Sequence, residues 1–163
     1  MSGLPVASPR RTAAHASAAW YVAPAAAFLS AGAGYVHLAY TQSHWRDWWA
    51  YGAFFLAAGV FQLLYGPVLL RRPGPKVVLL GIAGNLAVVG MYVYSRTEGV
   101  PLGPHARVKE AAGAVDVATT AAEILVVALL LALAGGRSRR WTLNLLLVAG
   151  LALWAMRLGQ GFG

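Results

Sequence analysis

The stretch DVATTAAEILVVALLLALA, residues 116–134, decides the fold class of this chain. Its second half is an unbroken apolar run, and the segment has the roughly 20 residues that an α-helix needs to cross a hydrocarbon core about 30 Å thick. Two carboxylates, Asp116 and Glu123, nevertheless stand in its first half. The sequence therefore predicts a membrane-spanning helix that carries ionisable groups into the bilayer.

The composition of the whole chain agrees with this. Of its 163 residues, 59% are hydrophobic and 11% are charged, against roughly 45–50% and 25% in soluble domains. Long apolar runs recur along the chain, separated by the polar segments SHWRD, RRPGP, RTEGVPLGPHARVKE and GGRSRR. We predict an all-α, polytopic membrane protein, a compact bundle of five transmembrane helices with spans at 18–41, 47–70, 76–95, 112–134 and 140–158.

The first apolar run follows two arginines, as in a secretory signal peptide, but it is longer than a signal h-region and contains His37. We therefore predict a retained first helix, a flexible cytoplasmic tail over 1–17 and one transmembrane domain over 18–163. Pro24 predicts that the first helix begins or kinks near it. The absence of cysteine excludes disulfides, thiolate metal sites and CxxC redox chemistry.

The distribution of Lys and Arg predicts the orientation. With a cytoplasmic N-terminus, the inner segments hold eight of the 13 basic residues: Arg10, Arg11, Arg71, Arg72, Lys76, Arg137, Arg139 and Arg140. The five acidic residues all fall on the outer side or on the helix that enters from it. We predict N-terminus in, C-terminus out, in a bacterial plasma membrane. The net charge of +8 is then explained by insertion and anionic lipid, and no nucleic-acid partner is expected.

Polar residues of the fourth span follow the period of a helix. Asp116, Thr119, Thr120 and Glu123 are spaced i, i+3, i+4 and i+7, so they share one face. A carboxylate near the middle of the bilayer costs about 3 kcal/mol on insertion scales, so Glu123 must face protein or water. This predicts a polar stripe directed into the bundle.

A second stripe lies on the first span, where Ser30, His37, Thr41 and His44 stack along one side. The small residues SAGAG, 30–34, favour close approach of another helix just below His37. Gln62, Asn85 and Asn144 add one amide each to the second, third and fifth spans. For these amides the expected role is an interhelical hydrogen bond.

Two interpretations of the carboxylates remain open. In the structural one, Asp116 and Glu123 are neutralised by a partner, with His37, Arg96, Arg107 and Arg157 as the candidates. In the functional one, His37, Asp116 and Glu123 form a site, open to the outer face, that binds or conducts a small cation. Imidazole and carboxylates suit a divalent transition metal, the cofactor considered, and equally a proton relay. His44, His105 and Glu110 are weaker candidates for an outer metal site, because no HxxxH or HExxH spacing occurs.

Two other functions compete with cation binding. The chain is short and all its predicted structure lies in the membrane, which suits a non-catalytic accessory or assembly subunit of a larger membrane complex, or a homo-oligomer. A membrane oxidoreductase or lipid-modifying enzyme that uses a quinone, haem or lipid is the third alternative, with Asp116 or Glu123 as general acid or base. No GxSxG, Walker or GxGxxG motif is found, so no catalytic residue is assigned and an enzyme is not favoured.

Three segments carry a resemblance to known sequences: YVHLAYTQSHWRDWWAYGAFFLAAGVFQLLYG, GNLAVVGMYVYSRTEGVPLGP and VDVATTAAEILVVALL. They resemble a group of small multi-pass membrane proteins of high-GC bacteria that are generally described only as hypothetical. The resemblance covers roughly residues 30–134. It implies a bacterial plasma-membrane location and carries no activity.

Overall fold

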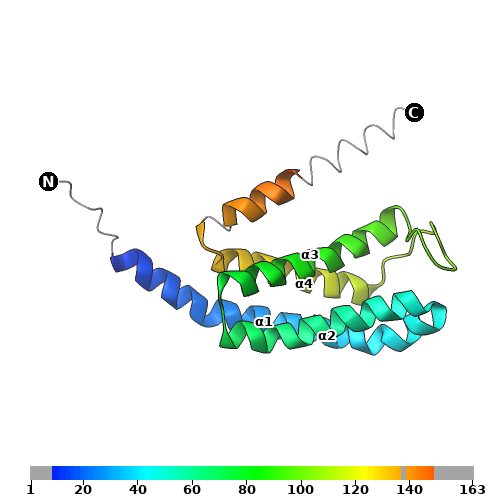
Figure 1. Ribbon diagram of the computed structural model, residues 1–163, viewed down its shortest axis with the longest axis horizontal. Coiled ribbons are helices and arrows are strands. Elements are labelled where there is room, and N and C mark those ends of the chain that lie inside the picture. The colour runs from blue at the N-terminus through cyan, green and yellow to red at the C-terminus, as the bar shows by residue number, and fades with distance from the viewer. Residues whose placement is uncertain (1–8, 137–138, 149–163) are drawn as a thin grey trace. The chain divides into compact units, whose positions relative to one another are not determined.

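The computed structural model describes the fold of residues 9–136 and 139–148, with side chains from Tyr21 onward (Figure 1). Its first compact unit, ending at Leu133, contains the helices α1 (Pro9–Asp47), α2 (Trp49–Arg71), α3 (Pro75–Thr97) and α4 (Ala114–Leu133). No strand occurs in the residues that the structure describes. The prediction of an all-α fold is therefore confirmed for them.

The four helices form a bundle in which each helix makes its main contacts with two others. The contacts run α1 to α2, α2 to α3, α3 to α4 and α4 back to α1, and the α1–α2 contact is the most extensive. Figure 1 shows α1 and α2 lying side by side along most of α2. Single-residue and three-residue connections, at Trp48 and at 72–74, make consecutive helices antiparallel.

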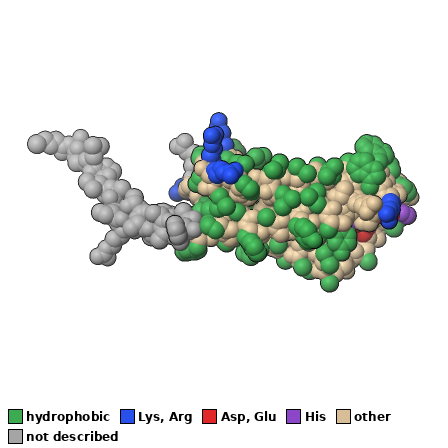
Figure 2. All heavy atoms as spheres, turned by 90° about the horizontal axis from the view of Figure 1, so that it is seen from below, with side chains coloured by type: hydrophobic (Ala, Val, Ile, Leu, Met, Phe, Trp, Pro, Cys, Tyr) green, Lys and Arg blue, Asp and Glu red, His purple; other side chains and the backbone are tan. Residues whose placement is uncertain are grey.

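All four helices are long and apolar enough to cross a membrane, over Tyr21–Asp47, Trp49–Arg71, Pro75–Thr97 and Ala114–Leu133. The predicted second, third and fourth spans agree with them within about two residues. On the face shown in Figure 2, charged side chains gather at the two ends, and hydrophobic side chains cover the stretch between. This distribution is compatible with an integral membrane protein.

At the N-terminal end the first helix begins earlier than predicted, and at the C-terminal end the structure describes only part of the predicted fifth span. Helix α1 begins at Pro9 and continues through Pro24, so it starts nine residues before the predicted span, inside the segment predicted as a tail. Figure 1 shows α1 bending between its start and the bundle, as expected where proline removes a backbone donor. The predicted fifth span, 140–158, is helical over 139–148, and its remainder lies outside the described residues.

Close packing of α1 on α2 depends on two glycines. A Cβ added to Gly34 would lie 2.9 Å from the backbone oxygen of Gly59 and 2.9 Å from the backbone nitrogen of Leu63. The helix backbones are therefore in contact at this level, which a side chain on either glycine would prevent. The predicted close approach at the SAGAG segment is confirmed, one turn from His37.

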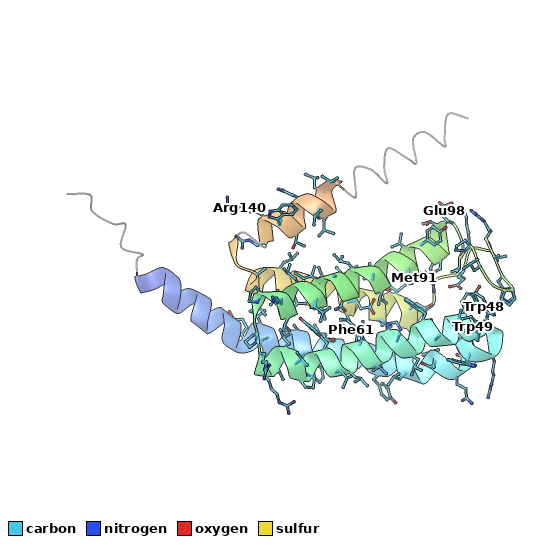
Figure 3. The ribbon with its side chains drawn as sticks, in the orientation of Figure 1. Trp48, Trp49, Phe61, Met91, Glu98 and Arg140 are labelled. Atoms are coloured by element: carbon cyan, nitrogen blue, oxygen red, sulfur yellow. The ribbon has the colours of Figure 1, made fainter. Side chains whose placement is uncertain are left out.

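The α3–α4 loop is held at its end of the bundle by specific contacts. The loop turns through positive φ at Gly99, Gly103 and Arg107, and its Leu102 carbonyl oxygen accepts a hydrogen bond of 2.8 Å from the Tyr51 hydroxyl. Trp48 and Trp49 lie at this same end (Figure 3). The loop is thus held against the start of α2.

Candidate functional site

A chamber of about 580 Å³ occupies the loop end of the bundle. Its floor includes the buried residues His37, Thr120 and Glu123, and its mouth includes exposed residues such as Asp47 and Glu110. Aromatic and aliphatic side chains form most of the wall between them: Val36, Tyr40, Phe54, Phe55, Val88, Met91 and Tyr92. The chamber therefore connects a buried polar floor to one end of the bundle.

The floor joins α1 to α4 through one short contact. His37 Nε2 lies 2.9 Å from Glu123 Oε1, and the two residues are only 7% and 1% exposed. Phe55 packs edge-on against the His37 ring, with 5.3 Å between ring centroids. The sequence predicts His37 as one of the possible partners of Glu123, and the structure brings the two together.

Two amides extend this contact into the core. Gln62 Nε2 donates to Glu123 Oε1 at 2.8 Å and to Asn85 Oδ1 at 3.3 Å, and both amide residues are fully buried. Asn85 Nδ2 in turn donates to the Gly81 carbonyl oxygen at 2.8 Å. The orientation of the Gln62 amide follows from the carboxylate, because its carbonyl oxygen in that place would repel an ionised Glu123. All four helices therefore contribute a side chain to one network.

The network lies deep in the predicted membrane-spanning region. At about 1.5 Å per residue, Glu123 is about 14 Å from the start of α4 and His37 about 15 Å from the end of α1. Both are near the middle of a 30 Å core. Further from the mouth, the side chains buried in the bundle are mainly aliphatic: Leu69, Val78, Ile82, Val126, Val127 and Leu130. The polar floor is thus reached through the chamber and is backed by mainly aliphatic packing, in which the buried hydroxyls of Ser30 and Tyr65 donate to backbone carbonyl oxygens.

The mouth is organised by Arg96. Its guanidinium donates to Glu110 Oε2 at 2.7 Å through one nitrogen and to Asp116 Oδ2 at 2.9 Å through the other. The same group lies 4.3 Å from the centroid of the Tyr92 ring. Asp116 also accepts from the backbone N–H of Gly113 at 3.1 Å. Arg96 therefore ties the α3–α4 loop and the first turn of α4 to α3.

The predicted stripe on α4 is confirmed as one face, because Asp116, Thr119, Thr120 and Glu123 all line the chamber. The structural interpretation of Asp116 also finds its partner, Arg96. Thr119 donates to the Val115 carbonyl oxygen, one turn earlier in α4. The two carboxylates of this helix thus have separate surroundings, Asp116 at the mouth and Glu123 at the floor.

The residues predicted as metal ligands are not gathered into one cluster. His44 stacks on Phe55 with 3.6 Å between centroids, His105 is exposed in the α3–α4 loop, and Glu110 is bound to Arg96. Across residues 9–136 and 139–148, no three His, Cys, Asp or Glu side chains are grouped so that they could hold a metal ion. Asp116 in particular pairs with Arg96, and the structure gives no support to a three-ligand metal site.

The α3 wall of the chamber was not predicted. Its lining residues are Val88, Met91, Tyr92, Ser95 and Arg96. Their offsets of three, four, seven and eight residues place them on one helical face, and this periodicity is visible in the sequence. Most of these side chains are apolar, so a search for polar stripes passes over them.

Comparison with protein-family models, with curated proteins and with solved structures finds no match to this chain. The resemblance to small multi-pass bacterial proteins therefore stays a prediction, as does the bacterial plasma membrane as location.

Proposed function

We propose that the protein spans the membrane and that its His37–Glu123 pair binds a proton, exchanging it with one side of the membrane only. The observation that carries this proposal is the 2.9 Å contact between His37 Nε2 and Glu123 Oε1 at the floor of a chamber that extends to the loop end of the bundle. By the distribution of Lys and Arg, this mouth faces the outside.

The chemistry of the pair suits one proton. A neutral imidazole with its hydrogen on Nε2 donates to the carboxylate, and an added proton converts the contact into an ion pair without a change of partners. Gln62 holds the carboxylate in place through the 2.8 Å bond to the same oxygen. Proton uptake then leaves the pair with no net charge, whereas the pair without the added proton carries one negative charge.

A proton is a better fit than the transition metal that the sequence also suggested. Zinc sites in proteins have three or four protein ligands, and at the floor His37 and Glu123 are two. Asp116 is held by Arg96 at the mouth. The small cation of the sequence-based hypothesis is therefore assigned here as a proton.

One-sided exchange is supported by the packing around the network. The chamber supplies a route from the mouth to His37, whereas buried aliphatic side chains such as Leu69, Val126 and Leu130 follow behind Gln62 and Asn85. These three side chains offer no hydrogen-bonding group to carry a proton. We therefore expect a binding site open to one compartment and no continuous relay across the bundle.

Infrared difference spectroscopy of oriented vesicles tests the proposal. The full chain is reconstituted, pH jumps are applied to each side in turn, and the carboxylic-acid C=O band is recorded with Glu123→Gln as the assignment variant. Asp47→Asn, at the exposed mouth, is the control that removes a carboxylate without touching the floor. We expect the Glu123 band to follow the pH of one side only.

The proposal is refuted if no band sensitive to Glu123→Gln responds to pH, or if the band follows both sides equally. Elemental analysis of the purified protein decides the metal alternative, because a stoichiometric transition metal would replace the proton in this assignment. Purification in mild detergent tests the accessory-subunit alternative: co-purifying stoichiometric membrane proteins would favour it, and a single-component particle would argue against it.

A further inference from the structure

The chamber is larger than proton exchange requires. Its volume of about 580 Å³ falls in the range of roughly 300–1,000 Å³ that small-molecule sites occupy. Such sites combine apolar walls with a few polar groups that fix the orientation of the ligand. The floor and wall of this chamber have that composition, so a ligand of compatible chemistry can be deduced from them.

Two buried acceptors of the network, His37 Nδ1 and Gln62 Oε1, have no hydrogen-bond partner among the described residues, and of these two residues His37 lines the chamber. His37 Nδ1 is buried and has no hydrogen-bond partner, while Nε2 of the same ring is engaged by Glu123. A neutral imidazole that donates through Nε2 must present a lone pair at Nδ1. The His37 side chain is nine-tenths buried. Its Nδ1 atom can therefore accept a hydrogen bond from a ligand that carries an N–H or O–H group.

The charge of the lining selects among donors. Four carboxylates line the chamber against the single guanidinium of Arg96: Asp47, Glu110, Asp116 and Glu123. With both histidines neutral the lining carries a formal charge of minus three, and a cleft of one sign concentrates ions of the opposite sign. Fatty acids and other anions are disfavoured here, and a cationic donor is favoured over a neutral one.

The walls supply the second element of cation recognition. Six aromatic rings besides the two histidines line the chamber: Tyr40, Trp48, Tyr51, Phe54, Phe55 and Tyr92. Aromatic faces attract ammonium groups, and Arg96 over Tyr92 shows this interaction at the mouth. The same rings disfavour a hydrated metal ion and accept an organic substituent.

From these observations we infer that the chamber binds a lipophilic ammonium ion, a protonated secondary or tertiary amine whose N–H group donates to His37 Nδ1 and whose apolar part lies against Phe54, Phe55 and Met91. The inference rests on the proposed function only in using the same His37–Glu123 pair. The amine and the proton are two forms of cation reaching one floor through one mouth.

A ligand series with one skeleton tests this inference. Calorimetric titration of the full chain in nanodiscs, with empty nanodiscs as blank, compares dimethyl(phenylbutyl)amine, phenylbutanol, phenylbutyrate and trimethyl(phenylbutyl)ammonium. We expect the tertiary amine to bind at least about tenfold more tightly than the alcohol, and the anion not to bind. The quaternary ammonium, which lacks the N–H group, should lose about tenfold, the factor of one charge-assisted hydrogen bond.

Two variants locate the binding. Met91→Trp fills the chamber from the α3 wall and should abolish amine binding, whereas Leu64→Trp, at an exposed position of α2, should leave it unchanged. Equal affinity for amine and alcohol, tightest binding of phenylbutyrate, or full binding by Met91→Trp would each overturn the inference. If the infrared band of Glu123 responds to pH but the protein binds no amine, the amine inference is refuted and the proposed proton site is not.

Discussion

Replacing Gly34 by alanine tests the packing that brings α1 to the site. An added Cβ would lie 2.9 Å from Gly59 O and from Leu63 N, and 3.1 Å from Gln62 Cβ. The first two are backbone atoms, so the helices must separate by about 0.5 Å before these contacts reach the ordinary range. We expect the resulting overpacking to cost about 1–3 kcal/mol.

Gly32→Ala is the matched control, two residues away in the same helix. Its Cβ would meet no atom within 4 Å, so this variant reports only the intrinsic gain of about 1 kcal/mol when alanine replaces glycine in a helix. The difference between the two variants isolates the contact with α2. It should equal the overpacking cost of about 1–3 kcal/mol.

The measurement is SDS-induced unfolding in mixed micelles, followed by tryptophan fluorescence. Because His37 lies one turn from Gly34, we also expect Gly34→Ala to weaken amine binding while Gly32→Ala does not. If the free energies of unfolding of the two variants agree within about 0.5 kcal/mol, the backbone contact between α1 and α2 does not exist as described. The position of His37 then loses its support.

Two further substitutions probe the mouth and the floor separately. Arg96→Met should release the loop 98–113, which would be seen as faster amide hydrogen exchange there. Arg71→Met, at the end of α2 that lies away from this loop, should leave the loop exchange unchanged. Equal loop exchange in both variants would show that the ion pairs of Arg96 do not order the loop. Gln62→Leu removes one of the two hydrogen-bond donors to Glu123 and should lower the free energy of unfolding in SDS by about 1–3 kcal/mol. An unchanged free energy of unfolding would contradict the 2.8 Å bond.

The sequence predicts faces well because helical periodicity is local. The stripe from Asp116 to Glu123 follows from spacing alone, and so does the stripe that contains His37. Which stripes meet is a different question, since it depends on the rotation and order of the helices around the bundle. Spacing therefore left four candidate partners for the two carboxylates, and only the fold assigns His37 to Glu123 and Arg96 to Asp116.

The metal hypothesis illustrates the same limit. Three ligands on two helices satisfied the chemistry of a cation site, but Asp116 stands about two turns from Glu123 along α4. At that level Asp116 pairs with Arg96, which lies in the last turn of α3. The amides of Gln62 and Asn85 were expected to make interhelical hydrogen bonds, and they do so with each other and, through Gln62, with the carboxylate. The contact of Gln62 with Glu123 required long-range packing that no local pattern encodes.

The aliphatic layer behind Asn85 has a consequence for how the molecule can work. Under the proposed one-sided exchange, whatever occupies the floor leaves by the path along which it arrived, because Leu69 and Leu130 are fully buried behind it. Occupancy then reports the contents of a single aqueous compartment, as in a sensor or a reservoir. Net transfer to the other compartment would require the helices of the bundle to separate, and the glycine contact between α1 and α2 resists such a separation.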